Sequence, residues 1–197
     1  MERAIFARHA ESSFNVLDVA NGDVDLPGGL TPLGREQAAA LGEALRDERV
    51  DLCVTSEFER ARATADEALA GRDVPRIVLP ALNDPLYGPY EGKLLEAYRT
   101  WAWTHPSTLG PGDGGESRVA IVERYTRAFR ALLASPEATI LVVAHSLPVA
   151  YALDARDGQA PSARVPFAGH AVPYPFTAKE LETATRLLEG WVAAPDW

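Results

Sequence analysis

The sequence predicts an α/β fold, a three-layer sandwich in which helices cover both faces of a mostly parallel central sheet. Four short apolar runs lack the polar alternation of a half-exposed antiparallel strand, so we expect the sheet to be covered on both sides. Amphipathic helical patterns separate these runs, and this alternation is typical of parallel strands joined by helices. The length of 197 residues suits one domain, residues 1–197, without a linker segment.

The predicted strands are short and uniformly apolar, as expected for strands buried between two layers of helices. They comprise residues 4–7, 52–55, 77–79 and 139–144. The first predicted helix begins where Thr31 can act as N-cap and Pro32 takes the first helical position, with side chains at four-residue spacing up to Leu45. The second predicted helix spans the alanine-rich residues 57–69.

Two further helices follow in the second half of the chain. Residues 116–133 place their large apolar side chains on one broad stripe, which predicts an amphipathic helix. Thr177 and Glu180 form a capping-box pattern that opens the last predicted helix. The glycine- and proline-rich residues 21–29 and 104–115 are predicted to be long loops, and loops of that length are commonly functional.

The charge balance narrows the classes of function. The chain has 28 acidic and 19 basic side chains, a formal net charge of −9, and a sequence pI of about 4.9. A nucleic-acid-binding surface requires clustered positive charge, so nucleic acid is not an expected partner. Cys53 is the one cysteine and excludes an internal disulfide. No apolar stretch is long enough for a secretory signal or a membrane span, so we expect a soluble, cytoplasmic protein without a membrane partner.

Polar side chains follow the predicted strands at their carboxyl ends, where ligands bind in open α/β sheets. In strand order these side chains are Arg8 and His9, Arg60, Asp84, and His145. A neutral imidazole is a competent nucleophile at neutral pH, and arginine forks neutralise phosphoryl oxygens. A second, protonated histidine would add positive charge in the transition state, and a carboxylic acid would protonate the leaving oxygen. The combination predicts binding and transfer of a phosphoryl group.

Six motifs in chain order make the sequence resemble the histidine phosphatase superfamily, which includes the cofactor-dependent phosphoglycerate mutases. The motifs lie at residues 8–15, 30–38, 56–65, 82–92, 114–117 and 143–145. The first reads Arg-His-Ala-Glu and is followed by an asparagine, the second is a Leu-Thr-x-x-Gly-x-x-Gln-Ala helix start, and the third carries an Arg-Ala-x-x-Thr-Ala sequence. The resemblance implies a phosphoglycerate mutase-like fold.

The resemblance also implies roles for individual residues. His9 would be the phosphorylated nucleophile, and Arg8, Arg60 and His145 would form the phosphate pocket. Asn15 is a further candidate for a phosphate contact.

Three positions depart from the family pattern. Ala10 replaces the usual glycine after the nucleophile. Ser146 starts the dipeptide that replaces Gly-Gly after the second histidine, at a helix start that serine can cap. Asp84 occupies the position where the family most often has a glutamate as proton donor, and Glu91 is the alternative donor. We favour Asp84 because it lies nearer the end of a strand.

Several side chains have competing interpretations. A metal site formed by His9, Glu11, His145 and His170 is disfavoured because arginines stand beside these residues, so we expect neither a metal nor a cofactor. His170 is interpreted as a surface or loop histidine in a segment that could return to the sheet edge. Trp101 and Trp103 could line a substrate pocket or close a satellite cluster under the long loop, and both interpretations stay open.

The predicted function is hydrolysis of a small phosphorylated metabolite through a phosphohistidine intermediate on His9. Phosphoglycerate mutase is an alternative, although residues 146–197 do not resemble the C-terminal tail of the mutases. A non-catalytic relative that binds phosphorylated ligands is a second alternative. The presence of both histidines and both arginines favours the enzyme, because binding alone requires no nucleophile. The sequence predicts no particular oligomeric state.

Overall fold

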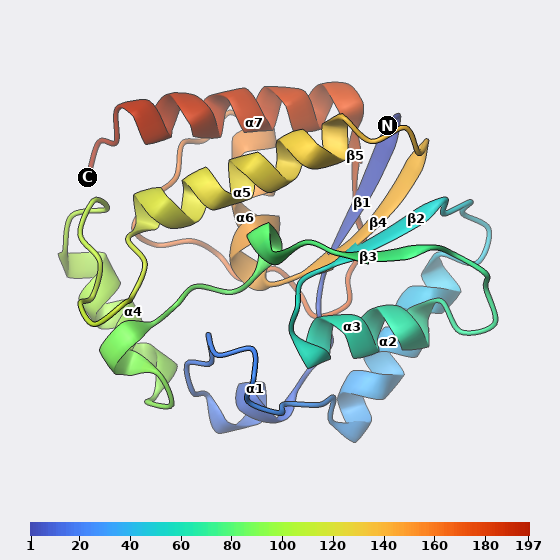
Figure 1. The fold of residues 1–197 in the computed structure, drawn as a ribbon, viewed down its shortest axis with the longest axis horizontal. Helices are drawn as coiled ribbons and strands as arrows, with labels where there is room; N and C mark the ends of the chain where they lie inside the picture. The colour runs from blue at the N-terminus through green and yellow to red at the C-terminus, as the bar shows by residue number, and fades with distance from the viewer.

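A computed structural model describes all residues, 1–197, and its centre is a five-stranded sheet (Figure 1). The strand order is β3-β2-β4-β1-β5. The strands are β1 (Arg3–Arg8), β2 (Leu52–Thr55), β3 (Arg76–Val78), β4 (Thr139–Ala144) and β5 (Tyr174–Thr177). The first four strands are parallel, and β5 pairs antiparallel with β1 at one edge. The mostly parallel sheet predicted from the sequence is confirmed.

Helices cover both faces of the sheet, so the predicted three-layer sandwich is confirmed as well. On one face, α2 (Pro32–Ala44) and α3 (Glu59–Ala68) bury the side chains of Ile5, Cys53 and Leu141. The opposite face packs against α5 (Arg118–Leu133), α6 (Ser146–Arg156) and α7 (Ala178–Ala193). Alternate residues of each central strand therefore point into two separate cores, which explains their uninterrupted apolar sequences.

The predicted strand at residues 77–79 departs from the expected burial. Ile77 and Val78 are 49% and 47% exposed, and every residue of β3 faces solvent. The prediction that both faces of this strand are covered is wrong, because β3 is the edge strand beyond β2. An apolar run does not tell an edge strand from a central one, since the order of strands is set by long-range pairing.

The helix start signals agree with the structure in two places and fail in one. The Thr31 hydroxyl accepts a hydrogen bond from the Gly34 amide, and Thr177 and Glu180 form the capping box of α7. Ser146, predicted as a cap, is instead the first residue of α6, and His145 occupies the N-cap position. The Ser146 hydroxyl accepts a hydrogen bond from the Ala168 amide, so it ties a distant loop to the helix.

Elements that the sequence did not predict are short or lack periodicity. They are α1 (Ser13–Leu17), the 3-10 helices η1 (Pro80–Leu82) and η2 (Gly88–Tyr90), α4 (Leu95–Thr104), the full length of α6, and β5. The helix α6 is apolar on nearly all sides because it lies between the sheet and α7, so its sequence has no amphipathic period. The strand β5 contains Pro175, which only an edge strand tolerates well.

The loop after β1 is held in place by the start of α2. Thr31 donates its hydroxyl to a Glu11 carboxylate oxygen at 2.7 Å, and the Gln37 amide oxygen accepts the Glu11 backbone N–H at 2.9 Å. Gly34 permits this approach, since a Cβ atom there would lie 2.0 Å from the Glu11 carbonyl oxygen. The helix-start motif therefore fixes the backbone immediately after His9, and it draws the Glu11 side chain toward α2.

We expect Gly34→Ala to destabilise the fold by about 1–3 kcal/mol, the range for overpacking, and to lower kcat/KM because the displaced loop follows His9. Gly190→Ala in α7 is the matched control, because its Cβ would meet no atom within 4 Å. That change should be neutral or stabilise the fold by roughly 0.5–1 kcal/mol. Urea unfolding of both variants, with activity measured in parallel, makes the comparison. Equal stability of the two variants would contradict the proposed role of Gly34.

Candidate active site

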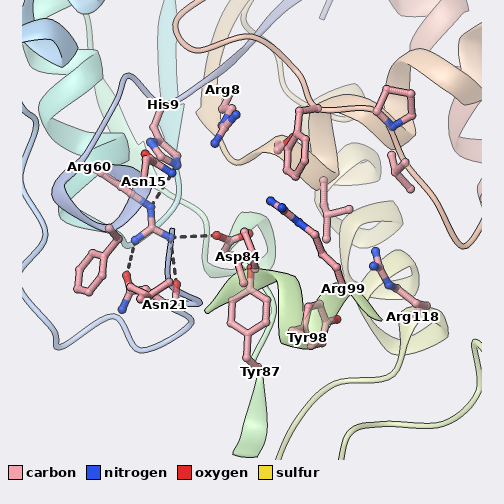
Figure 2. A pocket seen from close by; sticks show the side chains of 18 of the residues that line it. Arg8, His9, Asn15, Asn21, Arg60, Asp84, Tyr87, Tyr98, Arg99 and Arg118 are labelled. Carbon is pink, nitrogen blue, oxygen red and sulfur yellow. Dashed lines mark hydrogen bonds and ion pairs between the residues drawn. The ribbon is translucent and has the colours of Figure 1, made fainter. Parts of the chain in front are cut away.

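The sheet brings the predicted site residues together at the carboxyl edge of its parallel strands. Arg8 ends β1, His9 follows it, Arg60 lies in the first turn of α3, and Asp84 follows η1. His145 follows β4, and because β4 pairs with β1 in register, its ring centroid lies 5.2 Å from that of His9. All but His145 line one pocket, which contains about 830 Å³ of empty space including its open mouth (Figure 2).

His9 is held in one tautomer. Its Nδ1 lies 2.8 Å from the carbonyl oxygen of Ala10, and a carbonyl oxygen can only accept a hydrogen bond, so Nδ1 carries the proton. The Nε2 atom then carries the unprotonated lone pair of the ring, which accepts a hydrogen bond from Arg60 Nε at 3.2 Å. Burial, with Arg60 and Arg8 acting in the same direction, lowers the pKa of His9 well below its ordinary value. The ring is therefore neutral, with Nε2 unprotonated, and it lines the pocket.

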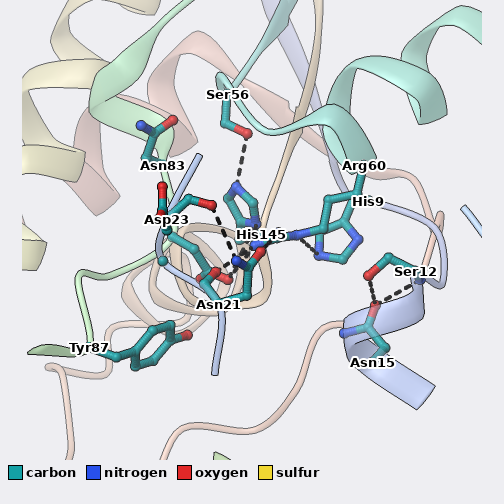
Figure 3. Close-up of polar contacts among 12 residues, drawn as sticks. His9, Ser12, Asn15, Asn21, Asp23, Ser56, Arg60, Asn83, Tyr87 and His145 are labelled. Atoms are coloured by element: carbon teal, nitrogen blue, oxygen red, sulfur yellow. Dashed lines mark hydrogen bonds and ion pairs between the residues drawn. The ribbon is translucent and has the colours of Figure 1, made fainter. Parts of the chain in front are cut away.

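Arg60 lies at the centre of the polar contacts (Figure 3). Besides His9, its guanidinium donates to the Asn21 side-chain oxygen at 2.5 Å and to Asp84 Oδ2 at 3.0 Å. It also packs over the Phe58 ring, 4.1 Å from the centroid. Asn21 comes from a predicted loop and is itself buried. Sequence reasoning missed Asn21, since an asparagine in a glycine-rich loop is an ordinary turn residue.

Arg8 has fewer protein partners than Arg60. One Nη1 hydrogen bond goes to the carbonyl oxygen of Ala168 at 3.1 Å, and the buried Nε has no partner. Burial lowers the pKa of Arg8 to about 10, which leaves the guanidinium charged at neutral pH. A charged group with unused donors at the pocket wall is available to an anionic ligand.

Asp84, and not Glu91, lies beside His145 and Arg60. Its Oδ2 is 3.0 Å from Arg60 Nη2 and 3.5 Å from His145 Nδ1. Burial raises the pKa of Asp84, although Arg60 and Arg8 oppose that change. Glu91 instead accepts the backbone N–H groups of Gly22 and Tyr87, each at 2.9 Å, and so joins two loops. The position of Asp84 after a strand end is the reason for its closer approach.

His145 is fully buried, and its surroundings do not favour the protonated form expected from the sequence. Its Nε2 lies 2.8 Å from the Ser56 hydroxyl, and its Nδ1 lies 3.4 Å from Arg60 Nη2 (Figure 3). Burial first, and then the charge of Arg60, lowers the pKa of His145 well below its ordinary value. The ring is therefore neutral in the free site. A bound phosphate dianion would raise this pKa again, because an opposite charge stabilises the imidazolium.

Asn15 and His170 also reach the site. The Asn15 side-chain oxygen accepts both the Ser12 backbone N–H and the Ser12 hydroxyl, so the amide NH₂ group is left for the pocket that Asn15 lines. His170 is not a distant surface histidine. Its segment returns to the sheet edge, where Nδ1 donates to the His9 carbonyl oxygen at 2.8 Å.

The two tryptophans divide between the two interpretations left open by the sequence. Trp101 packs against a small cluster that includes Tyr87 and Tyr98, whereas Trp103 lines the pocket. Both belong to α4, and residues two apart on a helix point in different directions.

The structure has no helix that is both long and apolar enough to cross a membrane.

The opposite pKa shifts of His9 and Asp84 predict the pH dependence. As the predicted nucleophile, His9 would act while neutral, so its lowered pKa would move the acid limb of kcat/KM below the ordinary histidine range. As the predicted proton donor, Asp84 would act only while protonated, so activity would fall as the pH rises through its raised pKa. We expect the basic limb to be lost in Asp84→Asn. The pH profiles of the wild-type enzyme and the variant are measured with the same substrate, so that titration of the substrate affects the two profiles equally. An unchanged basic limb in that variant would assign it to another group.

Comparison with known proteins agrees with this geometry. The histidine phosphatase superfamily (branch 1) matches residues 4–170. The adenosylcobalamin/alpha-ribazole phosphatase of Salmonella typhimurium is 33% identical over 153 residues, which cover 73% of this chain and 73% of that protein. A 2,3-bisphosphoglycerate-dependent phosphoglycerate mutase of Methylobacterium sp. is 34% identical over 139 residues, covering 63% of this chain and 64% of the mutase.

Solved structures place the fold in the same group. The crystal structure of the alpha-ribazole phosphatase from Shigella flexneri superposes with a TM-score of 0.73 at 27% identity, covering 88% of this chain and 89% of that chain. The family match over residues 4–170 includes the strands and helices that carry Arg8, His9, Arg60 and His145. The chain therefore belongs to branch 1 of the histidine phosphatase superfamily and is a phosphatase.

Proposed function

We propose that this phosphatase hydrolyses small phosphorylated metabolites through a phosphohistidine intermediate on His9. The observation that carries the proposal is the His9 tautomer, which leaves Nε2 unprotonated beside Arg60 in a ring that lines the pocket. In the first step Nε2 attacks the phosphorus atom while the bond to the leaving oxygen breaks. In the second step water attacks the phosphohistidine, which releases phosphate and restores the neutral ring.

Asp84 is the proposed proton donor for the leaving oxygen. Its raised pKa favours the protonated form that a general acid requires, and its carboxyl group lies within the same pocket as His9. After the first step the carboxylate can take a proton from the attacking water, so one group serves both steps. Arg8 and Arg60 hold the phosphoryl oxygens, and His145 and Asn15 complete the phosphate contacts.

The pocket wall supports a substrate with a ring or an apolar body next to the phosphate. Aromatic side chains on this wall are Phe14, Tyr87, Tyr98, Trp103 and Phe167. The relatives named alpha-ribazole phosphatase make alpha-ribazole phosphate the first substrate to assay. Hydrolysis of p-nitrophenyl phosphate and alpha-ribazole phosphate, with release of inorganic phosphate, tests the proposal. A folded protein that hydrolyses no phosphomonoester would instead support the non-catalytic binding alternative.

Mutase activity is the second candidate, favoured by the 34% identity to a phosphoglycerate mutase. A mutase and a hydrolase share the phosphohistidine step and differ in what accepts the phosphoryl group. Incubation with 3-phosphoglycerate distinguishes them, because a mutase forms 2-phosphoglycerate with little release of phosphate. Phosphate release faster than isomer exchange would support the hydrolase.

Activity is proposed to need no metal, because Arg8 and Arg60 supply the positive charge that a metal would supply to a phosphoryl group. We expect unchanged kcat in excess EDTA. Loss of activity with EDTA, restored by zinc or magnesium, would contradict the mechanism.

The buried free thiol of Cys53 fits a reducing compartment, and we infer a cytoplasmic location that fractionation of cells can test.

A further inference from the structure

Arg118 is a buried guanidinium on the pocket wall with almost no protein partners. It begins α5 and is 8% exposed. Its Nη1 donates to the Tyr151 hydroxyl at 3.1 Å, its Nε has no partner, and Nη2 makes no hydrogen bond to the protein. The Tyr98 ring lies beside it, 5.8 Å from the guanidinium carbon. A buried positive charge that is paired with no carboxylate is unfavourable unless something else compensates it.

The other buried or half-buried arginines at this end of the fold separate into two kinds. Arg60 pairs with Asp84 at 3.0 Å, and Arg124 pairs with Glu116 at 2.7 Å. Arg8 pairs with no carboxylate and, like Arg118, leaves a buried Nε without a partner. The proposed function assigns Arg8 to the phosphoryl group of the substrate. Arg118 has the same unused donors at a different place in the same pocket.

Arg99 adds a further positive charge to the pocket, and it shares the Phe167 ring with Arg8. It comes from α4, lines the pocket, and lies 4.4 Å over the ring of Phe167. Figure 2 shows Arg99 and Arg118 on the side of Asp84 away from His9 and Arg60, with the Arg99 guanidinium directed into the pocket. Its nearest carboxylate, Glu96, is 3.7 Å away, which is a long contact for an ion pair.

The charges along the pocket exceed what one phosphoryl group requires. Four arginines and one carboxylate, Asp84, line it. Arg8 and Arg60 lie next to His9, where the phosphoryl group would bind. Arg99 and Arg118 lie farther along the pocket, on the side where the leaving group of the substrate must extend. These two guanidinium groups therefore face the leaving group rather than the phosphorus.

We infer that Arg118, with Arg99, forms a second anion subsite, and that the preferred substrate is a phosphomonoester whose leaving group carries a carboxylate or a second phosphoryl group. This inference rests on the proposed function and specifies its substrate class. Planar guanidinium groups bind such oxyanions through paired, charge-assisted hydrogen bonds. Phe167, which packs against both Arg8 and Arg99, would contact the body of the substrate that joins its two anionic groups.

Matched substrate pairs test the inference, each differing in one charged group. The pairs are 3-phosphoglycerate and glycerol 3-phosphate, 4-carboxyphenyl and 4-carbamoylphenyl phosphate, and 6-phosphogluconate and sorbitol 6-phosphate. They place the carboxylate at increasing distance from the phosphate. We expect the wild-type enzyme to prefer the carboxylate in at least one pair by about tenfold or more in kcat/KM. A ratio near one in all three pairs would overturn the inference and leave the proposed hydrolysis intact.

Substitutions of Arg118 then test whether this residue causes the preference for substrates with a carboxylate. Arg118→Gln should reduce the carboxylate-to-neutral ratio to about one, and Arg118→Lys should retain part of it, since lysine keeps the charge without the fork. Arg127→Gln on the same helix is the control, because Arg127 is exposed and pairs with Glu123. It should leave the ratio unchanged. A folded Arg118→Gln protein with the wild-type ratio would overturn the assignment.

Arg99→Gln keeps the test decisive if the Arg118 variants do not fold. The Arg99 side chain is 22% exposed and does not belong to the buried core, so its loss should lower the same ratio without lowering the melting temperature. An unchanged ratio in Arg99→Gln, with Arg118 variants unfolded, would also overturn the subsite. Failure of the wild-type protein to hydrolyse any of the six compounds would overturn the subsite inference, and failure on p-nitrophenyl phosphate and alpha-ribazole phosphate as well would refute the proposed function.

Discussion

His9→Ala is expected to lower kcat/KM by about 10⁴-fold or more, the scale on which removal of a covalent nucleophile acts. The expectation follows from the unprotonated Nε2 of a pocket-lining ring whose Nδ1 proton is committed to the Ala10 carbonyl. Neither Arg60 nor Arg8 can replace it, because a charged guanidinium has no lone pair for attack. Steady-state hydrolysis of p-nitrophenyl phosphate measures the loss.

A trapping experiment connects that loss to the covalent intermediate. Rapid quenching of the wild-type enzyme in alkali with a ³²P-labelled substrate should yield labelled protein that loses its label in acid, as phosphohistidine does. The His9→Ala protein should carry no label. His105→Asn is the matched control, since His105 stacks on Trp101 and does not line the pocket. Acid-labile label on His9→Ala would place the nucleophile elsewhere.

Asp84→Asn is expected to slow turnover of an alkyl phosphate by about 10²–10⁴-fold, the usual contribution of a general acid. An amide cannot protonate the leaving alkoxide, although it can still accept the Arg60 hydrogen bond at a similar position. The loss should be much smaller with p-nitrophenyl phosphate, because p-nitrophenolate leaves without a proton. Comparing kcat for the two substrates therefore separates proton donation from simple misplacement of Arg60.

Glu91→Gln is the matched control for Asp84→Asn. Glu91 accepts two backbone N–H groups through two different oxygens, so glutamine can keep only one of these bonds. We expect a loss of about 1–3 kcal/mol in the free energy of unfolding, as for a charge-assisted hydrogen bond, and a smaller change in activity. The opposite order, with Glu91→Gln losing more activity on the alkyl phosphate, would make Glu91 the proton donor.

The meeting of Arg8, His9, Arg60 and His145 could be predicted because each follows a parallel strand or opens the helix after it. Carboxyl ends of parallel strands share one edge of the sheet, so placing the residue in sequence nearly places it in space. The same argument favoured Asp84 over Glu91, and the structure puts Asp84 beside His145. The phosphohistidine role of His9 stays a prediction until the intermediate is trapped.

Contacts between residues far apart in the chain could not be predicted in this way. Asn21 holds Arg60 from a loop with ordinary turn composition, and His170 reaches the His9 carbonyl across 161 positions. Arg118 has no sequence signal at all, since an arginine at the first position of a helix is usually exposed. Arg118 differs from such an arginine because its side chain is buried without a carboxylate partner. That burial results from the packing of α5 against the rest of the protein.

The sequence by itself determined the layered α/β fold, the family and the set of residues at the carboxyl edge of the sheet, because apolar periodicity, helix caps and strand-end positions are local patterns. Tertiary structure alone decided that β3 is an exposed edge, that His145 is neutral in the free site, and that Arg118 lacks a carboxylate. Each of these depends on which distant groups exclude water from a side chain or pair with its charge. Burial and pairing of that kind are properties of the packed chain, so no local pattern encodes them.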